Sequence, residues 1–271
     1  MTPLRKWSVV AAMVLGFGAV RLPLEHAMDA ERRAAGLRRD DAGLSLRQQA
    51  SESALIGVLG GLRALVAAFW DLWARDAWLK TNWGEVEKDY RFIQWLQPRV
   101  FYYWDVGQWM MATNAANSFA YDKSKPPGIA ELMSQAYVEK GRSMIEDGLK
   151  HLPDEWRMHQ AMALLLESRY AAGERDHLQI SEAWRKAAEC PGALGYCQRQ
   201  RAYHLCLVPG REREAYGLLR ALHARGKENR VPTLIAWIQY FEHTLDIPSP
   251  ERLFPAAAPG REPPRPRQPI P

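Results

Sequence analysis

Apolar residues recur at helical spacing through most of the chain. Between residues 54 and 80 they fall three or four positions apart, so they would share one broad helix face. These positions are Leu55, Val58, Leu62, Leu65, Val66, Phe69, Trp70, Trp73 and Ala77. The same spacing returns at residues 129–152 and 234–245, the latter after Pro232, which suits a first helical turn. No stretch alternates as a strand does, and the pattern therefore predicts an all-α fold.

One short stretch, FIQWLQPRVFYYW at residues 92–104, places six aromatic residues around Pro98. A proline at this position should end one helix before the next begins. We therefore expect two helices that turn at Pro98 and pack back against each other. The large rings of Phe92, Trp95, Phe101 and Trp104 would then fill the layer between them.

A spacing pattern recurs ahead of four helix breaks, three at prolines and one at a glycine. Small or medium residues flank a large one at similar offsets before Pro98, Pro153, Pro191 and Gly226. The positions are Val86, Tyr90 and Ile93; Gly141, Ile145 and Gly148; Ile180, Trp184 and Ala187; and Ala215, Leu219 and Leu222. This pattern predicts repeated helices that bury the same face.

Upstream of the first of these helices, Trp70, Trp73, Ala74 and Ala77 form a matching partner helix, and Trp104 begins the next one. This pattern resembles the tetratricopeptide repeat, with Trp70 and Trp73 on the Trp and Leu positions of its signature. The resemblance implies a solenoid of antiparallel helix pairs over residues 54–246. The intervals of 55 and 38 residues between prolines depart from the usual ~34. An irregular helical bundle is the alternative.

The two ends of the chain have different compositions. Arg5 and Lys6 precede an uncharged run, and residues 1–24 are typical of a signal anchor or a signal peptide. A polar linker follows at 25–53. Residues 247–271 hold nine of the eighteen prolines, which predicts a disordered, Pro-rich tail. Both interpretations of the N-terminus predict that the chain is exported. An anchor at residues 7–24 would hold it in a bacterial inner membrane with its body in the periplasm.

The sequence offers little chemistry. The formal charge of +5 is spread out, without a basic face interleaved with aromatics, so nucleic acid is not expected as a partner. We find no metal-binding or phosphate-binding motif and expect no cofactor. The one catalytic alternative pairs Glu167 and Ser168 with residues 192–195, a pattern similar to goose-type lytic transglycosylases. Glu167 would then be the general acid of a peptidoglycan lytic enzyme.

Three cysteines lie within seventeen residues, at Cys190, Cys197 and Cys206. In an oxidising compartment Cys190 and Cys197 could form a disulfide across a helix–helix turn. Separate buried thiols are the alternative. Three thiols without a further ligand do not make a zinc site.

The resemblance to membrane-anchored tetratricopeptide proteins of bacterial envelopes implies a non-enzymatic scaffold that binds another envelope protein or peptide. In such folds the first helix of each pair lines a concave groove. Carried onto this sequence, the groove positions are Asp71, Arg75, Trp78, Tyr102, Asp105 and Trp109. Rings give contact area and charges set register in such surfaces. Trp78 and Trp109 would instead belong to the core in the alternative interpretation.

Overall fold

The computed structural model describes residues 62–170 and 173–254, together with Ala27, Glu31 and Pro266. The predicted anchor lies outside these residues, as does the linker apart from Ala27 and Glu31. All regular structure in the described residues is helical, which confirms the all-α prediction. No helix in this part of the chain combines the length and apolar character that crossing a membrane requires.

The chain divides into two compact units, Met1–Leu152 and Pro153–Pro271. We call them unit 1 and unit 2. The division falls inside the segment 54–246, for which the sequence predicts a single continuous array.

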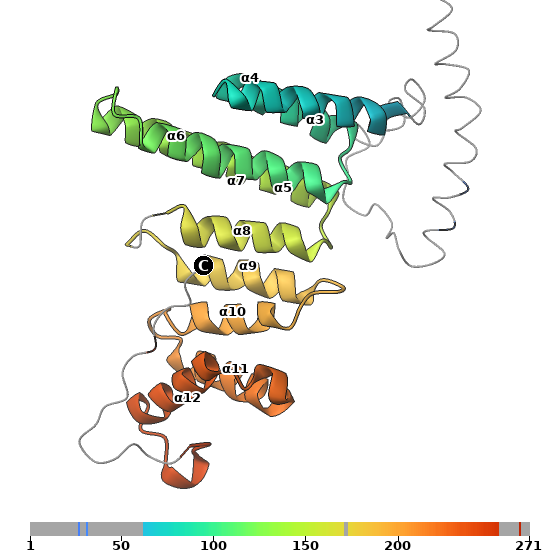
Figure 1. Cartoon of the computed structure of the whole chain (residues 1–271). Helices are drawn as coiled ribbons and strands as arrows, with labels where there is room; N and C mark the ends of the chain where they lie inside the picture. The colour runs from blue at the N-terminus through green and yellow to red at the C-terminus, as the bar shows by residue number, and fades with distance from the viewer. Residues whose placement is uncertain (1–26, 28–30, 32–61, 171–172, 255–265, 267–271) are drawn as a thin grey trace, which may run out of the picture. The chain divides into compact units, whose positions relative to one another are not determined.

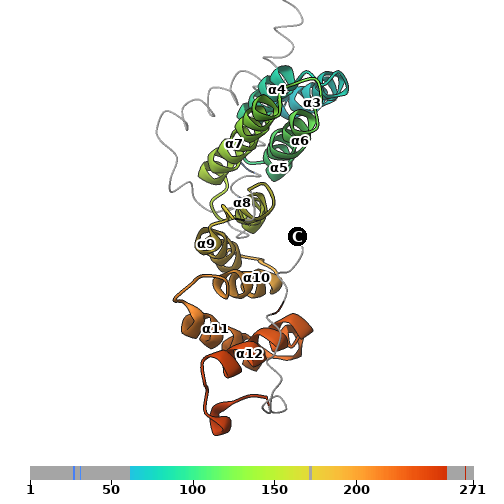
Figure 2. The same cartoon turned by 90° about the vertical axis from the view of Figure 1, so that its left-hand side faces the viewer.

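The described part of unit 1 consists of two helical hairpins (Figures 1 and 2). In the first, α3 (Arg63–Leu79) packs against α4 (Trp83–Leu96). In the second, α5 (Phe101–Trp109), the π-helical segment η2 (Met110–Ala115) and α6 (Ala116–Ala120) follow one another without a break and pack against α7 (Pro127–His151). The break between α4 and α5 spans Pro98, as the sequence predicts.

In the described part of unit 2, helices of 10 to 14 residues pack on one another in chain order. They are α8 (Trp156–Ser168), α9 (His177–Glu189), α10 (Tyr196–Leu205), α11 (Glu212–Arg225) and α12 (Pro232–Thr244). Two 3₁₀ turns, η3 (Lys227–Asn229) and η4 (Ser249–Glu251), follow α11 and α12. Asp176 is the N-cap of α9. Its side chain accepts hydrogen bonds from the backbone N–H groups of Leu178 and Gln179, both at 3.0 Å. Pro232 opens α12 as predicted.

The recurring positions ahead of the helix breaks are all buried, from Val86, Tyr90 and Ile93 in α4 to Ala215, Leu219 and Leu222 in α11. Glycine permits close packing at one of them, Gly141, and also at Gly107 of α5. A methyl group on Gly107 would lie 2.6 Å from the Gln94 Nε2 atom, and one on Gly141 would lie 2.6 Å from the Ala112 Cβ atom. The spacing pattern therefore identifies the core faces of these helices.

The aromatic core predicted around Pro98 is only partly correct. Trp104 is 4% exposed, and its indole N–H donates to the Pro98 carbonyl at 2.8 Å. Trp95, expected in the same layer, lies on the surface instead, as does Trp73. Trp95 stacks on Phe92, and Trp73 contacts Trp70 edge-on. Both indoles therefore cover the outer sides of other rings and leave one side to solvent.

The first eight residues of the predicted Pro-rich tail, 247–254, are structured, and the rest of that segment lies outside the described residues apart from Pro266. Ile247 and Phe254 pack against the core formed by α10, α11 and α12. The buried Glu242 carboxylate accepts hydrogen bonds from the backbone N–H groups of Leu253, at 2.6 Å, and Phe254, at 3.3 Å. Residues 247–254 are thus part of unit 2. The Glu242 carboxylate of α12 satisfies the backbone N–H groups of Leu253 and Phe254, which have no partner within a helix.

Candidate interaction surface

The six residues predicted for a partner-binding surface lie on the first helices of the two hairpins in unit 1. Asp71, Arg75 and Trp78 are on α3, and Tyr102, Asp105 and Trp109 are on α5. We call this set the α3–α5 surface. On α3, Asp71 and Trp78 share the face of the buried Ala67 and Ala74 at helical spacing. On α5, the core side holds Gly107.

The two tryptophans of the α3–α5 surface are not core residues. Trp78 is 37% exposed and Trp109 is 47% exposed. Tyr102 is also exposed. Burying such rings against a partner would remove a large apolar area from water, and tryptophan and tyrosine are enriched where binding energy concentrates. Neither ring is fully enclosed by the described residues.

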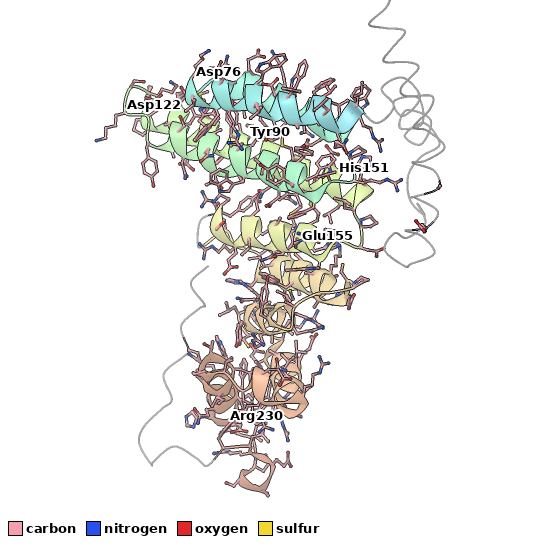
Figure 3. The ribbon with its side chains drawn as sticks, turned by 45° about the vertical axis from the view of Figure 1, so that its right-hand side comes forward. Asp76, Tyr90, Asp122, His151, Glu155 and Arg230 are labelled. Atoms are coloured by element: carbon pink, nitrogen blue, oxygen red, sulfur yellow. The ribbon has the colours of Figure 1, made fainter. Side chains whose placement is uncertain are left out.

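Asp71 departs from the pattern of an exposed surface residue, because it is only 9% exposed. The hydroxyl of Tyr90, which is labelled in Figure 3, donates a 2.9 Å hydrogen bond to the Asp71 Oδ1 atom. The Arg75 Nη2 atom is 4.0 Å from Asp71 Oδ2. Asp71 thus joins the two helices of the first hairpin and also contributes negative charge beside the exposed rings.

The electrostatics of the surface couple α3, α4 and α5. Burial raises the pKa of Tyr90, and the hydrogen bond to Asp71 and the charge of that carboxylate raise the pKa further. Burial also raises the pKa of Tyr103, with the Asp71 carboxylate and Tyr102 acting in the same direction. Both phenols therefore stay neutral at physiological pH.

Sequence reasoning missed a second exposed apolar area on the first hairpin. Leu65, Phe69, Leu72 and Trp73 of α3 and Trp95 of α4 are all exposed. Trp70 connects the two helices there, with ring centroids 4.7 Å from Phe92 and an indole N–H that donates to the Asp89 Oδ1 atom at 2.9 Å. A signal was present in the sequence, since apolar residues run nearly around α3, which exceeds what a single core face needs.

Glu167, the candidate general acid, lies buried at the end of α8. Its Oε2 atom is 3.5 Å from the Nε2 atom of the buried His204, and His204 Nδ1 is 3.2 Å from His177 Nδ1. Burial lowers the pKa of His177, and the nearby His204 and Arg175 lower it further. A general acid must reach the atom that it protonates. The Glu167 carboxylate lies among buried side chains here, and its role as a general acid stays a prediction.

The candidate ligands in the described residues are not clustered as a metal site would require. Among the described residues, no group of three His, Cys, Asp or Glu side chains is arranged to hold a metal ion. Cys190 and Cys197 are both thiols in this structure, and burial raises the pKa of each. The Cys190 Sγ atom lies 3.3 Å from the Lys186 carbonyl oxygen. A disulfide between Cys190 and Cys197 stays a prediction for an oxidising compartment.

Comparison of the chain with protein-family models, with curated proteins and with solved structures finds no match. The site's own geometry is therefore the basis for assigning a function.

Proposed function

We propose that this protein is a non-enzymatic interaction module that binds another protein or peptide of the cell envelope through the α3–α5 surface. In this proposal the helical hairpins form a tetratricopeptide-like solenoid. Residues 7–24 anchor the chain in the inner membrane, and the body faces the periplasm. The sequence supports the anchor through Arg5, Lys6 and the uncharged run that follows them.

The observation that carries the proposal is the exposure of tryptophan in unit 1. Seven of the eleven tryptophans lie between residues 70 and 109. Four of them, Trp73, Trp78, Trp95 and Trp109, are exposed. In unit 2, by contrast, Trp184 and Trp237 are fully buried. Exposed large rings gathered in one part of a folded protein mark surfaces that bind a partner.

Pull-down from detergent-solubilised membranes, using the full chain as bait, tests this proposal. A protein captured by the wild type should be lost when Trp78→Ala and Trp109→Ala are combined, because both rings of the α3–α5 surface are then removed. Tyr121→Ala is the control, since this exposed ring lies at the end of α6, outside the α3–α5 surface. Equal capture by all three chains, or equal loss in both variants, would overturn the proposal.

Membrane fractionation tests the anchor separately. The full chain should stay in the membrane pellet after a carbonate wash, and a chain that starts near Ser51 should not. Recovery of the full chain in the cytosolic fraction would contradict both the anchor and the periplasmic placement.

A further inference from the structure

The buried Glu242 carboxylate of α12 binds the backbone of a non-helical segment. Among the described residues, three neutral donors serve it. The Leu253 N–H donates to Oε1 at 2.6 Å, and the Phe254 N–H donates to Oε2 at 3.3 Å. The Tyr216 hydroxyl of α11 is the third donor, 3.3 Å from Oε1. Glu242 is only 2% exposed, and a carboxylate buried to this degree needs such donors to replace its hydration.

The ring of Phe254 adds a side-chain contact to these backbone bonds. It meets His223 of α11 edge-on, with ring centroids 5.6 Å apart. It also packs, with Ile247, against the core formed by α10, α11 and α12. The Leu253 side chain, by contrast, is 41% exposed. The segment is therefore held through two backbone N–H groups and an aromatic ring.

The chain reaches this site as a loop that is separate from the helices. Asp246, with a φ of 50°, turns the chain away from the end of α12. The turn η4 leads it back, and the Arg252 Nε–H group donates to the Ile247 carbonyl at 2.6 Å. We call residues 247–254 the resident segment. Because it contributes no residue to an α-helix, it can leave Glu242 without unwinding one.

We propose that Glu242, Tyr216 and His223 form a peptide-docking site, which the resident segment fills until a partner segment of the same chemistry displaces it. The partner segment bends so that two consecutive backbone N–H groups converge on the Glu242 carboxylate, as N–H groups do in other anion-binding bends. Its second residue is aromatic and takes the place of Phe254. Backbone bonds do not distinguish one sequence from another, so the ring supplies the specificity. This site lies in unit 2 and does not depend on the α3–α5 surface.

The covalent attachment of the resident segment sets the strength of its competition. A segment tethered by a short linker acts at an effective concentration on the order of millimolar. A free peptide of equal intrinsic affinity therefore binds the wild-type chain only weakly. Weakening the resident segment should uncover the site while Glu242, Tyr216 and His223 stay unchanged.

The probe is a fluorescent, amidated peptide with the sequence of residues 247–254, IPSPERLF, added to the full chain in detergent micelles. Combining Leu253→Pro with Phe254→Ala removes one backbone donor and the ring from the resident segment. Arg252 already has the extended backbone that suits the residue before a proline. By fluorescence anisotropy, the peptide should bind this double variant at least about tenfold more tightly than the wild type. It should also raise the thermal midpoint of the double variant. Failure to bind the double variant, or equal binding to both chains, would overturn the proposal.

Matched peptides test each contact on the double variant. N-methylation of the peptide's leucine removes only the N–H group that faces Glu242 Oε1, and replacing its phenylalanine by alanine removes only the ring. Each change should weaken binding by about tenfold. Adding Glu242→Gln to the double variant should weaken binding of the parent peptide, because the charge is lost. An N-methylated peptide that binds as tightly as the parent would show that Glu242 does not bind the backbone, and would overturn the site.

Discussion

Gly141 of α7 lies directly against Ala112 of the π-helical segment η2. A methyl group added to Gly141 would lie 2.6 Å from the Ala112 Cβ atom and 2.9 Å from its backbone nitrogen. No side chain fits at this separation. The contact between the two long helices of the second hairpin therefore depends on a residue without a side chain.

We expect Gly141→Ala to lower the free energy of unfolding by about 1–3 kcal/mol, because the backbone of η2 must move to admit the methyl group. Urea denaturation measures the change. Gly128→Ala is the control on the same helix, where nothing lies within 4 Å of the added carbon. That variant should be neutral or slightly stabilising, and a similar loss in both variants would contradict the packing argument.

Trp109→Ala should leave the thermal midpoint almost unchanged, because the ring is about half exposed and fills no core volume. Trp104→Ala, five residues earlier on the same helix, should lower the free energy of unfolding by about 3–5 kcal/mol, because that ring is buried and bonded to the Pro98 carbonyl. Thermal unfolding followed by circular dichroism compares the two. A large loss for Trp109→Ala would place the ring in the core.

Glu242→Ala should release residues 247–254 from unit 2. The change leaves the backbone N–H groups of Leu253 and Phe254 without their acceptor, at a cost of about 1–3 kcal/mol. Trypsin should then cleave faster after Arg252. Glu242→Gln retains one acceptor oxygen and should show an intermediate rate. Cleavage at the wild-type rate in both variants would show that Glu242 does not hold the segment.

Unit 2 should lose stability as the pH falls from 7 to 5. Burial lowers the pKa of both His177 and His159 in the folded protein. In the unfolded chain a histidine has a pKa of about 6.5, so as the pH falls the unfolded chain is protonated at these residues before the folded protein is. The stabilisation is therefore present above the pKa of the unfolded chain's histidines. It is lost as the pH falls toward their lower pKa in the folded protein. Urea midpoints across this range test the trend, and His177→Gln should flatten it. An unchanged slope in that variant would exclude His177 as a cause.

Local spacing predicts much of the fold. The helix break at Pro98, the first turn at Pro232 and the buried positions of α4, α7, α9 and α11 all follow from which residues recur on one face. The exposure of Trp73 and Trp95 does not follow. Apolar residues surround α3 almost completely, and hydropathy alone does not say which side has a neighbouring helix to cover it.

Contacts distant in sequence account for the other differences. Asp71 is buried because Tyr90, nineteen residues later, supplies a hydrogen bond. Residues 253 and 254 are ordered because Glu242 accepts from their backbone. The spacing of apolar residues also does not predict the division between the units at Leu152 and Pro153, since helices on both sides have the same spacing pattern. Each of these depends on which elements meet, and periodicity carries no information about that.

The unequal exposure of tryptophan gives the protein two intrinsic optical reporters. Indoles in water emit at longer wavelength and are accessible to a dissolved quencher, whereas enclosed indoles are shielded. The red, quenchable part of the emission therefore comes from residues such as Trp78 and Trp109 in unit 1. In unit 2, the shielded emission at shorter wavelength comes from Trp184 and Trp237. Changes at the exposed rings and loss of structure around the enclosed ones can thus be followed separately in one unlabelled sample.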